Sequence, residues 1–147
     1  MEEKSEQNRY KYAHLLLGKA RHLILSARQK ELAPIRISSR QAYILYFLYH
    51  LGHKATVAEL AADSDREKNT ISLQMTIMAK DGLVRKIQEV PKSRLLSYEL
   101  TEKGIDTYNQ SKNSKTEKAI MTTLSKEECE QLIFLLEKIV KKAEIYQ

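Results

Sequence analysis

The chain has 147 residues, of which 25 are Lys or Arg and 19 are Asp or Glu, so the formal net charge is +6 and the sequence pI about 9.3. This length is enough for one domain of ordinary size whose core needs no disulfide or metal. A single cysteine, Cys129, excludes an intramolecular disulfide and a cysteine-based zinc cluster. The positive charge suits a polyanionic partner, although it also suits a merely soluble protein.

The hydropathy pattern predicts neither a membrane span nor a secretion signal. No apolar run approaches the roughly 18 residues that a membrane-spanning helix needs. The first residues, MEEKSEQNRYKY, are acidic and polar, whereas a signal peptide starts with basic and then apolar residues. We therefore expect a cytoplasmic protein that makes no contact with a membrane.

Residues 6–31 predict one long helix that ends before Pro34. Its apolar residues recur at helical spacing, but Leu15 and Leu25 lie well off the main stripe. A helix that is apolar on more than one side needs more than one neighbour. We expect part of it to pack on a second chain.

A second helix is predicted between Ser38 and Gly52. Ser38 and Gln41 form a Ser-x-x-Gln capping box, and Gly52 is a natural helix terminator. The helix has two apolar faces about half a turn apart. One face consists of Ile44, Leu45, Leu48 and Leu51, and the other of Tyr43, Tyr46, Phe47 and His50.

Two further capping boxes, Thr56 to Glu59 and Ser64 to Glu67, follow in close succession. Two capped helices separated by a short polar turn predict a helix-turn-helix, whose second helix enters the major groove of DNA. On that second helix the spacing directs Ile71, Met75 and Met78 inward and leaves Arg66, Asn69, Thr70, Leu73 and Ile77 on the opposite side.

Gly82 ends the second helix of this pair, and a hairpin with a basic tip is predicted after it. Short β-rich runs at residues 83–90 and 95–100 flank Pro91, Lys92, Ser93 and Arg94. Leu96, Tyr98 and Leu100 alternate along the second run.

Two capped helices complete the chain. Thr101 caps the first, which the polar residues 111–115 interrupt, and a Ser125 to Glu128 capping box opens the second. The apolar residues of the last helix, from Leu132 to Val140, form a stripe too broad for a solvated tail.

This order of elements resembles the multiple-antibiotic-resistance regulator (MarR) family of bacterial transcription factors. The most specific pieces are Gly82-Leu83-Val84, Arg94, and Leu100-Thr101 with Gly104, and the resemblance covers nearly the whole chain. It implies a mainly α fold with a small β wing, that is, a winged helix-turn-helix. It also implies an N-terminal dimerisation helix at residues 1–32, a DNA-binding lobe at 33–100 and C-terminal dimerisation helices at 101–147.

The resemblance implies a homodimer in which the terminal helices of two chains interlock. This accounts for the excess apolar surface of the first and last helices. The residues expected in the dimer interface are Leu16, Leu17, Leu23, Ile24, Leu132, Leu136, Ile139 and Val140.

Two departures from the family pattern change the expected reading of DNA. The family usually has Asp-x-Arg in the wing, where the acid orients the arginine, whereas this chain has Lys92-Ser93-Arg94. The wing thus gains charge and salt-sensitive affinity. Leu73 and Ile77 stand where basic side chains are common, so contact with thymine methyl groups replaces contact with guanine. Both facts lead to the hypothesis of an A·T-rich operator.

The expected DNA contacts come from the second helix of the helix-turn-helix, the wing and the start of the helix after Ser38. For Ser39 and Arg40 the simple helix cap is favoured over a phosphate contact. Lys86 and Lys92 are expected near phosphates. The full set is Ser39, Arg40, Arg66, Lys68, Asn69, Thr70, Leu73, Lys86, Lys92, Ser93 and Arg94.

The aromatic face of Tyr43, Tyr46, Phe47 and His50 has two interpretations. Packing between the lobe and the dimer helices is favoured. The alternative, which the family resemblance suggests, is a crevice for a small aromatic effector.

No cofactor or metal is predicted. The four histidines, His14, His22, His50 and His53, raise the alternative of a zinc sensor, but no nearby Asp, Glu or Cys completes a ligand set with His50 and His53. For Cys129, burial as a small hydrophobe is favoured over a redox role.

The sequence therefore predicts a sequence-specific regulator that binds double-stranded DNA. We expect a homodimeric repressor on a pseudo-palindromic operator, released by a small effector. The alternative is a winged helix used only for protein docking. An enzyme is not expected, because the sequence has no Gly-rich phosphate loop, no nucleophile with a matching base and no recognisable catalytic carboxylate pair.

Overall fold

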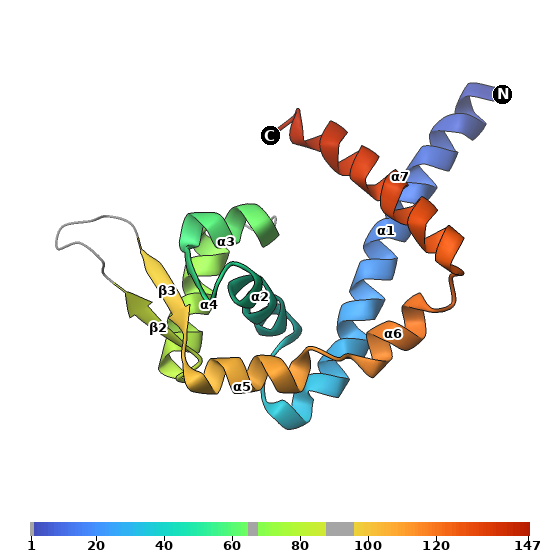
Figure 1. Cartoon of the computed structure of the whole chain (residues 1–147). Helices are drawn as coiled ribbons and strands as arrows, with labels where there is room; N and C mark the ends of the chain where they lie inside the picture. The colour runs from blue at the N-terminus through green and yellow to red at the C-terminus, as the bar shows by residue number, and fades with distance from the viewer. Residues whose placement is uncertain (1, 65–67, 88–95) are drawn as a thin grey trace. The chain divides into compact units, whose positions relative to one another are not determined.

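The computed structural model describes residues 2–64, 68–87 and 96–147 (Figure 1). The protein is mainly helical with a small antiparallel sheet, as predicted. Its elements are α1 (Glu2–Leu32), the 3-10 helix η1 (Ala33–Ile35), α2 (Ser39–His50), β1 (Lys54–Thr56), α3 (Val57–Ser64), α4 (Lys68–Lys80), β2 (Val84–Ile87), β3 (Ser97–Leu100), α5 (Glu102–Ser111), α6 (Lys115–Met121) and α7 (Lys126–Glu144).

The chain divides into two compact units, Met1–Ser114 and Lys115–Gln147. The first contains the winged-helix lobe with α1, and the second contains α6 and α7. The predicted functional boundaries at residues 32/33 and 100/101 remain a prediction. No helix in the described part of the chain is both long and apolar enough to cross a membrane.

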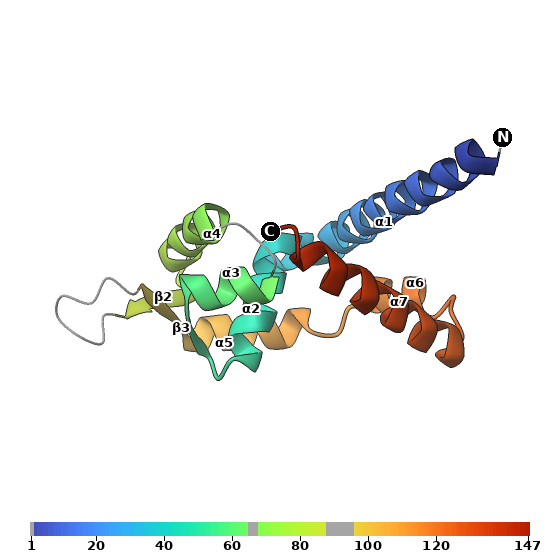
Figure 2. The same cartoon turned by 90° about the horizontal axis from the view of Figure 1, so that it is seen from above.

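Helix α1 is one continuous helix, longer at both ends than the predicted residues 6–31 (Figure 2). Its last residue, Leu32, is buried in the core of the lobe. Pro34 lies at the start of η1, and Arg36 then takes a left-handed conformation with φ of 63°. The chain turns there toward α2.

Helix α2 begins at the predicted capping box. The Ser38 hydroxyl accepts a hydrogen bond from the backbone N–H of Gln41 at 3.1 Å, and the Gln41 side chain accepts one from the N–H of Ser38 at 3.0 Å. Ile44, Leu45 and Leu48 are buried as predicted. Leu51, predicted for the same face, is exposed, because α2 ends at His50 and the chain reverses through Gly52 at φ of 86°.

The sheet has three antiparallel strands in the order β1-β3-β2. The predicted hairpin corresponds to β2 and β3, while residues 88–95 lie outside the described part of the chain. Strand β1 was not predicted. It has only three residues and pairs Ala55 with Tyr98, a partner 43 positions away, so no local pattern identifies it.

The hydrophobic core of the lobe draws on every helix from α2 to α5 and on the sheet. The second helix of the pair, α4, contributes the three predicted inward residues, Ile71, Met75 and Met78, all fully buried. The rest of the core includes Leu32, Ile37, Ala42, Ile44, Leu45, Leu48, Ala55, Leu60, Ala61, Leu83, Val84, Tyr98, Leu100 and Tyr108.

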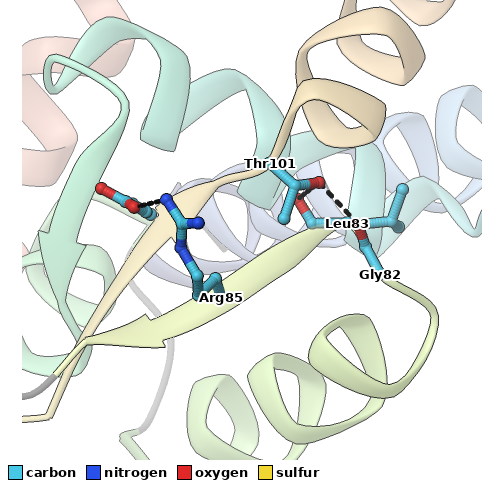
Figure 3. Close-up of polar contacts among 5 residues, drawn as sticks. Gly82, Leu83, Arg85 and Thr101 are labelled. Atoms are coloured by element: carbon cyan, nitrogen blue, oxygen red, sulfur yellow. Dashed lines mark hydrogen bonds and ion pairs between the residues drawn. The ribbon is translucent and has the colours of Figure 1, made fainter.

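The family-like motif around Gly82 and Thr101 has a direct structural role (Figure 3). The Thr101 hydroxyl donates to the carbonyl oxygen of Gly82 at 2.6 Å and lies 3.1 Å from that of Leu83. It also accepts from the N–H of Gly104, which caps α5. A Cβ on Gly104 would overlap the Leu83 carbonyl oxygen, so only glycine allows this close approach. The motif thus joins the end of β3 to the turn before β2.

The second unit consists of α6 and α7. The predicted capping box opens α7, because the Ser125 hydroxyl accepts from the N–H of Glu128 at 3.1 Å and Glu128 accepts from the N–H of Ser125 at 2.9 Å. No residue of α7 is buried. Its exposed apolar side chains are Ile133, Phe134, Leu135, Ile139 and Val140.

Candidate nucleic-acid interface

The exposed face of α4 lies opposite its buried face. Lys68 and Asn69, in the first turn, are exposed, and Thr70 is half-buried. Leu73 is 61% exposed and Ile77 is 39% exposed, although both are apolar. Because the buried residues hold α4 rigidly in the lobe, these side chains form a fixed polar and apolar surface that is available to a partner.

Four of the predicted DNA-binding residues fall outside the described part of the chain: Arg66, Lys92, Ser93 and Arg94. The third predicted capping box, Ser64 to Glu67, falls there as well, apart from the backbone of Ser64. These predictions rest on the sequence alone.

Ser39 is turned away from the surface. Its side chain is 8% exposed, and its hydroxyl donates to the carbonyl oxygen of Leu25 at 3.0 Å. Its backbone N–H donates to the Gln29 side chain at 2.8 Å. Both donors of Ser39 are therefore engaged with α1, which argues against a phosphate contact. Arg40, the next residue, is exposed.

The base of the wing carries an ion pair that the sequence analysis missed. Arg85 of β2 donates to the carboxylate of Glu99, which lies directly opposite on β3 (Figure 3). Lys54 of β1 is the register partner of Glu99 on its other side. Once the strand register is known, the alternation of charges across strands predicts this pair. Lys86, the predicted phosphate neighbour, is exposed on β2.

A cavity of about 550 Å³ lies between α1, the first turns of α2 and α4. Tyr43 is the one residue of the predicted effector set that lines it. Its other lining residues are Gly18, Arg21, His22, Leu25, Ser26, Gln29, Ser38, Ser39, Arg40 and Gln74. Tyr46, Phe47 and His50 do not line this cavity, so the cavity and the predicted effector face share only Tyr43.

Those three residues belong instead to an aromatic cluster at the end of α2. Tyr46 contacts Phe47 edge-on and His50 at a ring-centroid distance of 4.4 Å. Nε2 of His50 lies 3.3 Å from the Tyr108 hydroxyl of α5. This arrangement matches the favoured interpretation, in which the aromatic face serves packing.

Tyr108 anchors α5 to α2. Its ring stacks on Tyr49 with centroids 4.1 Å apart and an interplanar angle of 23°. Burial, with smaller contributions from Tyr49 and Tyr46, raises the pKa of Tyr108 above its ordinary value. The neutral phenol is thus the form that the packed lobe favours.

The histidines and the cysteine show no gathered ligand set. Within the described ranges, no group of three or more His, Cys, Asp or Glu side chains is arranged to hold a metal ion. Cys129 is half-buried in α7 rather than fully enclosed.

The residues predicted for a dimer interface are accessible in the single chain. Leu16, Leu17 and Leu23 of α1 are exposed, as are Ile139 and Val140 of α7. Ile24, Leu132 and Leu136 are half-buried. Surfaces of this apolar character are typical of interaction sites.

No protein-family model matches the sequence, and no curated protein matches it. Several solved structures, however, are similar to this chain. The organohalide-sensing transcriptional regulator RdhR-CbdbA1625, bound to 2,4-dichlorophenol, is 27% identical, with 90% of this chain and 80% of that chain covered and a TM-score of 0.83.

Two further structures carry the family name. A mutant of MarR from E. coli, complexed with operator DNA, is 17% identical over 90% of this chain and 96% of that one, with a TM-score of 0.80. AbsC from Streptomyces coelicolor, a MarR family transcriptional regulator, is 22% identical over 91% and 93%, with a TM-score of 0.78. These neighbours are transcriptional regulators, which are not enzymes. The chain therefore shares the winged-helix fold of these MarR family structures.

Proposed function

We propose that this protein is a homodimeric regulator that binds double-stranded DNA, represses transcription and is released by a small effector. The observation that carries the proposal is the exposed face of α4, with Lys68, Asn69, Leu73 and Ile77 opposite three fully buried residues. In a helix-turn-helix this is the face that enters the major groove. The likeness to MarR complexed with operator DNA supports this assignment.

The chemistry of α4 favours an A·T-rich operator. Leu73 and Ile77 offer exposed methyl groups, which pack against the thymine methyl in the major groove. Lys68 carries the positive charge of the first turn and suits a phosphate. The wing cations Lys92 and Arg94, known from sequence alone, would add salt-sensitive affinity.

The homodimer is part of the proposal because α1 and α7 each leave apolar side chains exposed in the single chain. A dimer places two α4 helices on half-sites about one turn, roughly 34 Å, apart, which requires a pseudo-palindromic operator. A cytoplasmic location is part of the same proposal, because the protein must reach the DNA that it regulates.

The effector site in this proposal is the cavity between α1, α2 and α4 rather than the aromatic cluster. Its size suits a small organic molecule. RdhR-CbdbA1625, the neighbour that binds 2,4-dichlorophenol, supports the presence of an effector. An effector acts only to the extent that it binds the DNA-free form more tightly than the DNA-bound form.

The test begins with selection of binding sites from a random duplex pool, followed by affinity measurements over a range of salt concentrations. We expect A·T-rich half-sites and a logarithmic affinity that falls linearly with the logarithm of salt concentration. Lys68→Gln should weaken binding to all sequences and reduce the salt slope by about one. Lys126→Gln, the same charge change on α7, should change neither.

The exposure of Leu73 and Ile77 also favours a second candidate, a docking surface for another protein. The two candidates differ in the effect of Leu73→Ala. For a DNA reader it lowers the preference for T at one operator position. Absence of any enriched site, together with salt-independent behaviour, would refute the DNA proposal and leave docking.

A further inference from the structure

Helix α1 joins the lobe through its C-terminal end. In the described part of this helix, every residue from 5 to 23 is exposed. Burial is concentrated near the end, where Arg28 is 8% exposed and Leu32 lies in the core. The angle of such a helix to the lobe depends on the contacts of its attached end, because the rest of its length is not enclosed.

On one side, polar bonds hold this end of α1 to the start of α2. The Gln29 side chain accepts from the backbone N–H of Ser39 at 2.8 Å and donates to the carbonyl oxygen of Ile37 at 3.3 Å. The Ser39 hydroxyl donates to the carbonyl oxygen of Leu25 at 3.0 Å. These bonds join two successive turns of α1 to one short segment of the lobe.

On another side, polar bonds hold the same end of α1 to the end of α5 (Figure 1). The Arg28 guanidinium donates to the carbonyl oxygen of Ser111, the last residue of α5, at 2.8 Å. The Glu31 carboxylate accepts from the Ser114 hydroxyl at 2.7 Å. Positions 28 and 31 lie on one face of a helix. One face of α1 therefore holds the segment that follows α5.

Arg28 is the buried charged residue among these groups. Burying a guanidinium group is costly unless it is hydrogen-bonded. The last carbonyl groups of a helix lack helical donors and carry a partial negative charge, so Ser111 offers Arg28 a suitable acceptor. A directional hydrogen bond restricts the angle between two helices more narrowly than apolar contact, which has no direction.

We propose that Arg28 is a positioning residue that fixes the angle between α1 and the lobe. In a dimer held through α1, this angle sets the separation of the two α4 helices, and so the half-site spacing that the dimer accepts. The step from angle to spacing rests on the proposed function. The step from Arg28 to angle concerns a single chain.

The single-chain step is measured without DNA. Spin labels are attached at Lys11→Cys on α1 and Thr76→Cys on α4, in a Cys129→Ser background that leaves no other thiol. Excess unlabelled chain ensures that pulsed electron paramagnetic resonance reports distances within one chain. We expect a narrow distance distribution that becomes about twofold wider with Arg28→Met, which keeps the length but loses the donors. An equally narrow distribution would overturn the role of Arg28.

Three further variants separate positioning from general loss of stability. Arg28→Lys keeps the charge and a donor, and should restore most of the narrow distribution. Arg9→Met makes the original change at an exposed position of α1 and should have no effect. Ile44→Val removes a methyl group from the core of the lobe and lowers stability alone, so it should also leave the distribution narrow.

The spacing step is measured with operators whose half-sites are moved apart or together by one base pair. The wild-type protein should lose affinity on the order of tenfold for each such change, because protein or DNA must deform to fit. Arg28→Met should bind the best operator more weakly but lose only about threefold per base pair, because a looser angle tolerates more spacings.

The outcomes of the two measurements are distinguishable. A wider distance distribution with an unchanged spacing profile would overturn the link between the angle and the operator. A wild-type protein that binds no duplex DNA at any spacing would refute the proposed function and the spacing step with it. The distance measurement would then still decide whether Arg28 fixes the angle.

Discussion

Helices α2 and α7 begin in the same way and end up in opposite environments. Both open with a serine capping box whose two hydrogen bonds are 2.9 to 3.1 Å long. Yet Leu45 of α2 is 0% exposed, whereas Ile139 of α7 is 50% exposed. Local sequence signals start a helix, but burial depends on what packs against it. In the proposed homodimer, this exposed apolar side of α7 is where a second chain would pack.

The largest expected effect is that of Leu45→Ala in α2. Removing a fully buried leucine loses its transfer free energy and leaves a cavity, so the free energy of unfolding should fall by about 4 kcal/mol. Urea unfolding at a fixed protein concentration measures this. The matched change in α7 is Ile139→Ala. Because it should weaken mainly the proposed dimer, its effect on the unfolding midpoint should vary with protein concentration. If the two changes lowered the unfolding midpoint equally at every protein concentration, the contrast between α2 and α7 would be contradicted.

Gly104→Ala should have the next largest effect. The added methyl group would overlap the Leu83 carbonyl oxygen, and the junction between β3 and the turn at Gly82 would have to move. We expect a loss of about 3 kcal/mol in the free energy of unfolding, at the upper end for single substitutions. The control is Gly18→Ala, which meets nothing within 4 Å and should stabilise α1 slightly. An unchanged Gly104→Ala protein would show that the close approach is not needed.

Ile139→Asp tests whether a second chain covers α7. A charge placed in an apolar interface should raise the dimer dissociation constant by about 30-fold, the equivalent of 2 kcal/mol at an interface hot spot. Analytical ultracentrifugation over a concentration series measures this. Lys142→Asp, at an exposed position one turn further along α7, is the control for the added carboxylate. A wild-type protein that is monomeric at all concentrations would contradict the proposed dimer.

Loss of either serine cap should have a smaller effect. Ser38→Ala and Ser125→Ala each remove one acceptor for a helical N–H, and each should lower the free energy of unfolding by about 1 kcal/mol. The two losses should be similar, because the boxes have the same geometry although the helices differ in burial. Thermal unfolding of both variants compares them. If only Ser38→Ala lowered the free energy of unfolding strongly, burial of the helix rather than the capping hydrogen bonds would determine how much a capping box stabilises the fold.

The smallest expected effect is a pH dependence at the start of α7. Hydrogen bonds from the backbone and side chain of Ser125 lower the pKa of Glu128 below its ordinary value of 4.5. The ionised carboxylate therefore stabilises the folded chain above that value, and the contribution disappears as the pH falls through the lower, folded-state pKa. The melting temperature of wild-type protein minus that of Glu128→Gln should shrink over this range. A melting-temperature difference that does not change with pH would show that the ionised Glu128 carboxylate does not stabilise the folded chain.

Much of the fold was predictable because its signals are local. The three capping boxes within the described residues join positions three apart, and the inward face of α4 follows from helical periodicity. The helix-turn-helix and the hairpin follow from the order of these signals. For the site, the exposed positions of α4 were correctly placed opposite Ile71, Met75 and Met78.

The features that were missed are contacts between distant parts of the chain. Ser39 donates hydrogen bonds to the Leu25 carbonyl oxygen and to the Gln29 side chain, which argues against the phosphate contact that was already the less favoured interpretation. Packing was favoured for the aromatic face of α2, but its partners were not predicted: Tyr43 lines the cavity, while His50 lies against Tyr108, 58 positions away. Strand register is needed before Arg85 and Glu99 can be seen as a pair.

The sequence by itself thus determined where the helices of this protein begin and which face of α4 turns inward, because these depend on hydrogen bonds and side-chain spacing within a few residues. Only the tertiary structure decided which polar groups remain available at the surface. It showed that Arg28 of α1 donates to the carbonyl oxygen of Ser111, 83 positions away, and that Arg21 and Arg40 share one cavity. Such pairings depend on how distant segments pack, which no local pattern encodes.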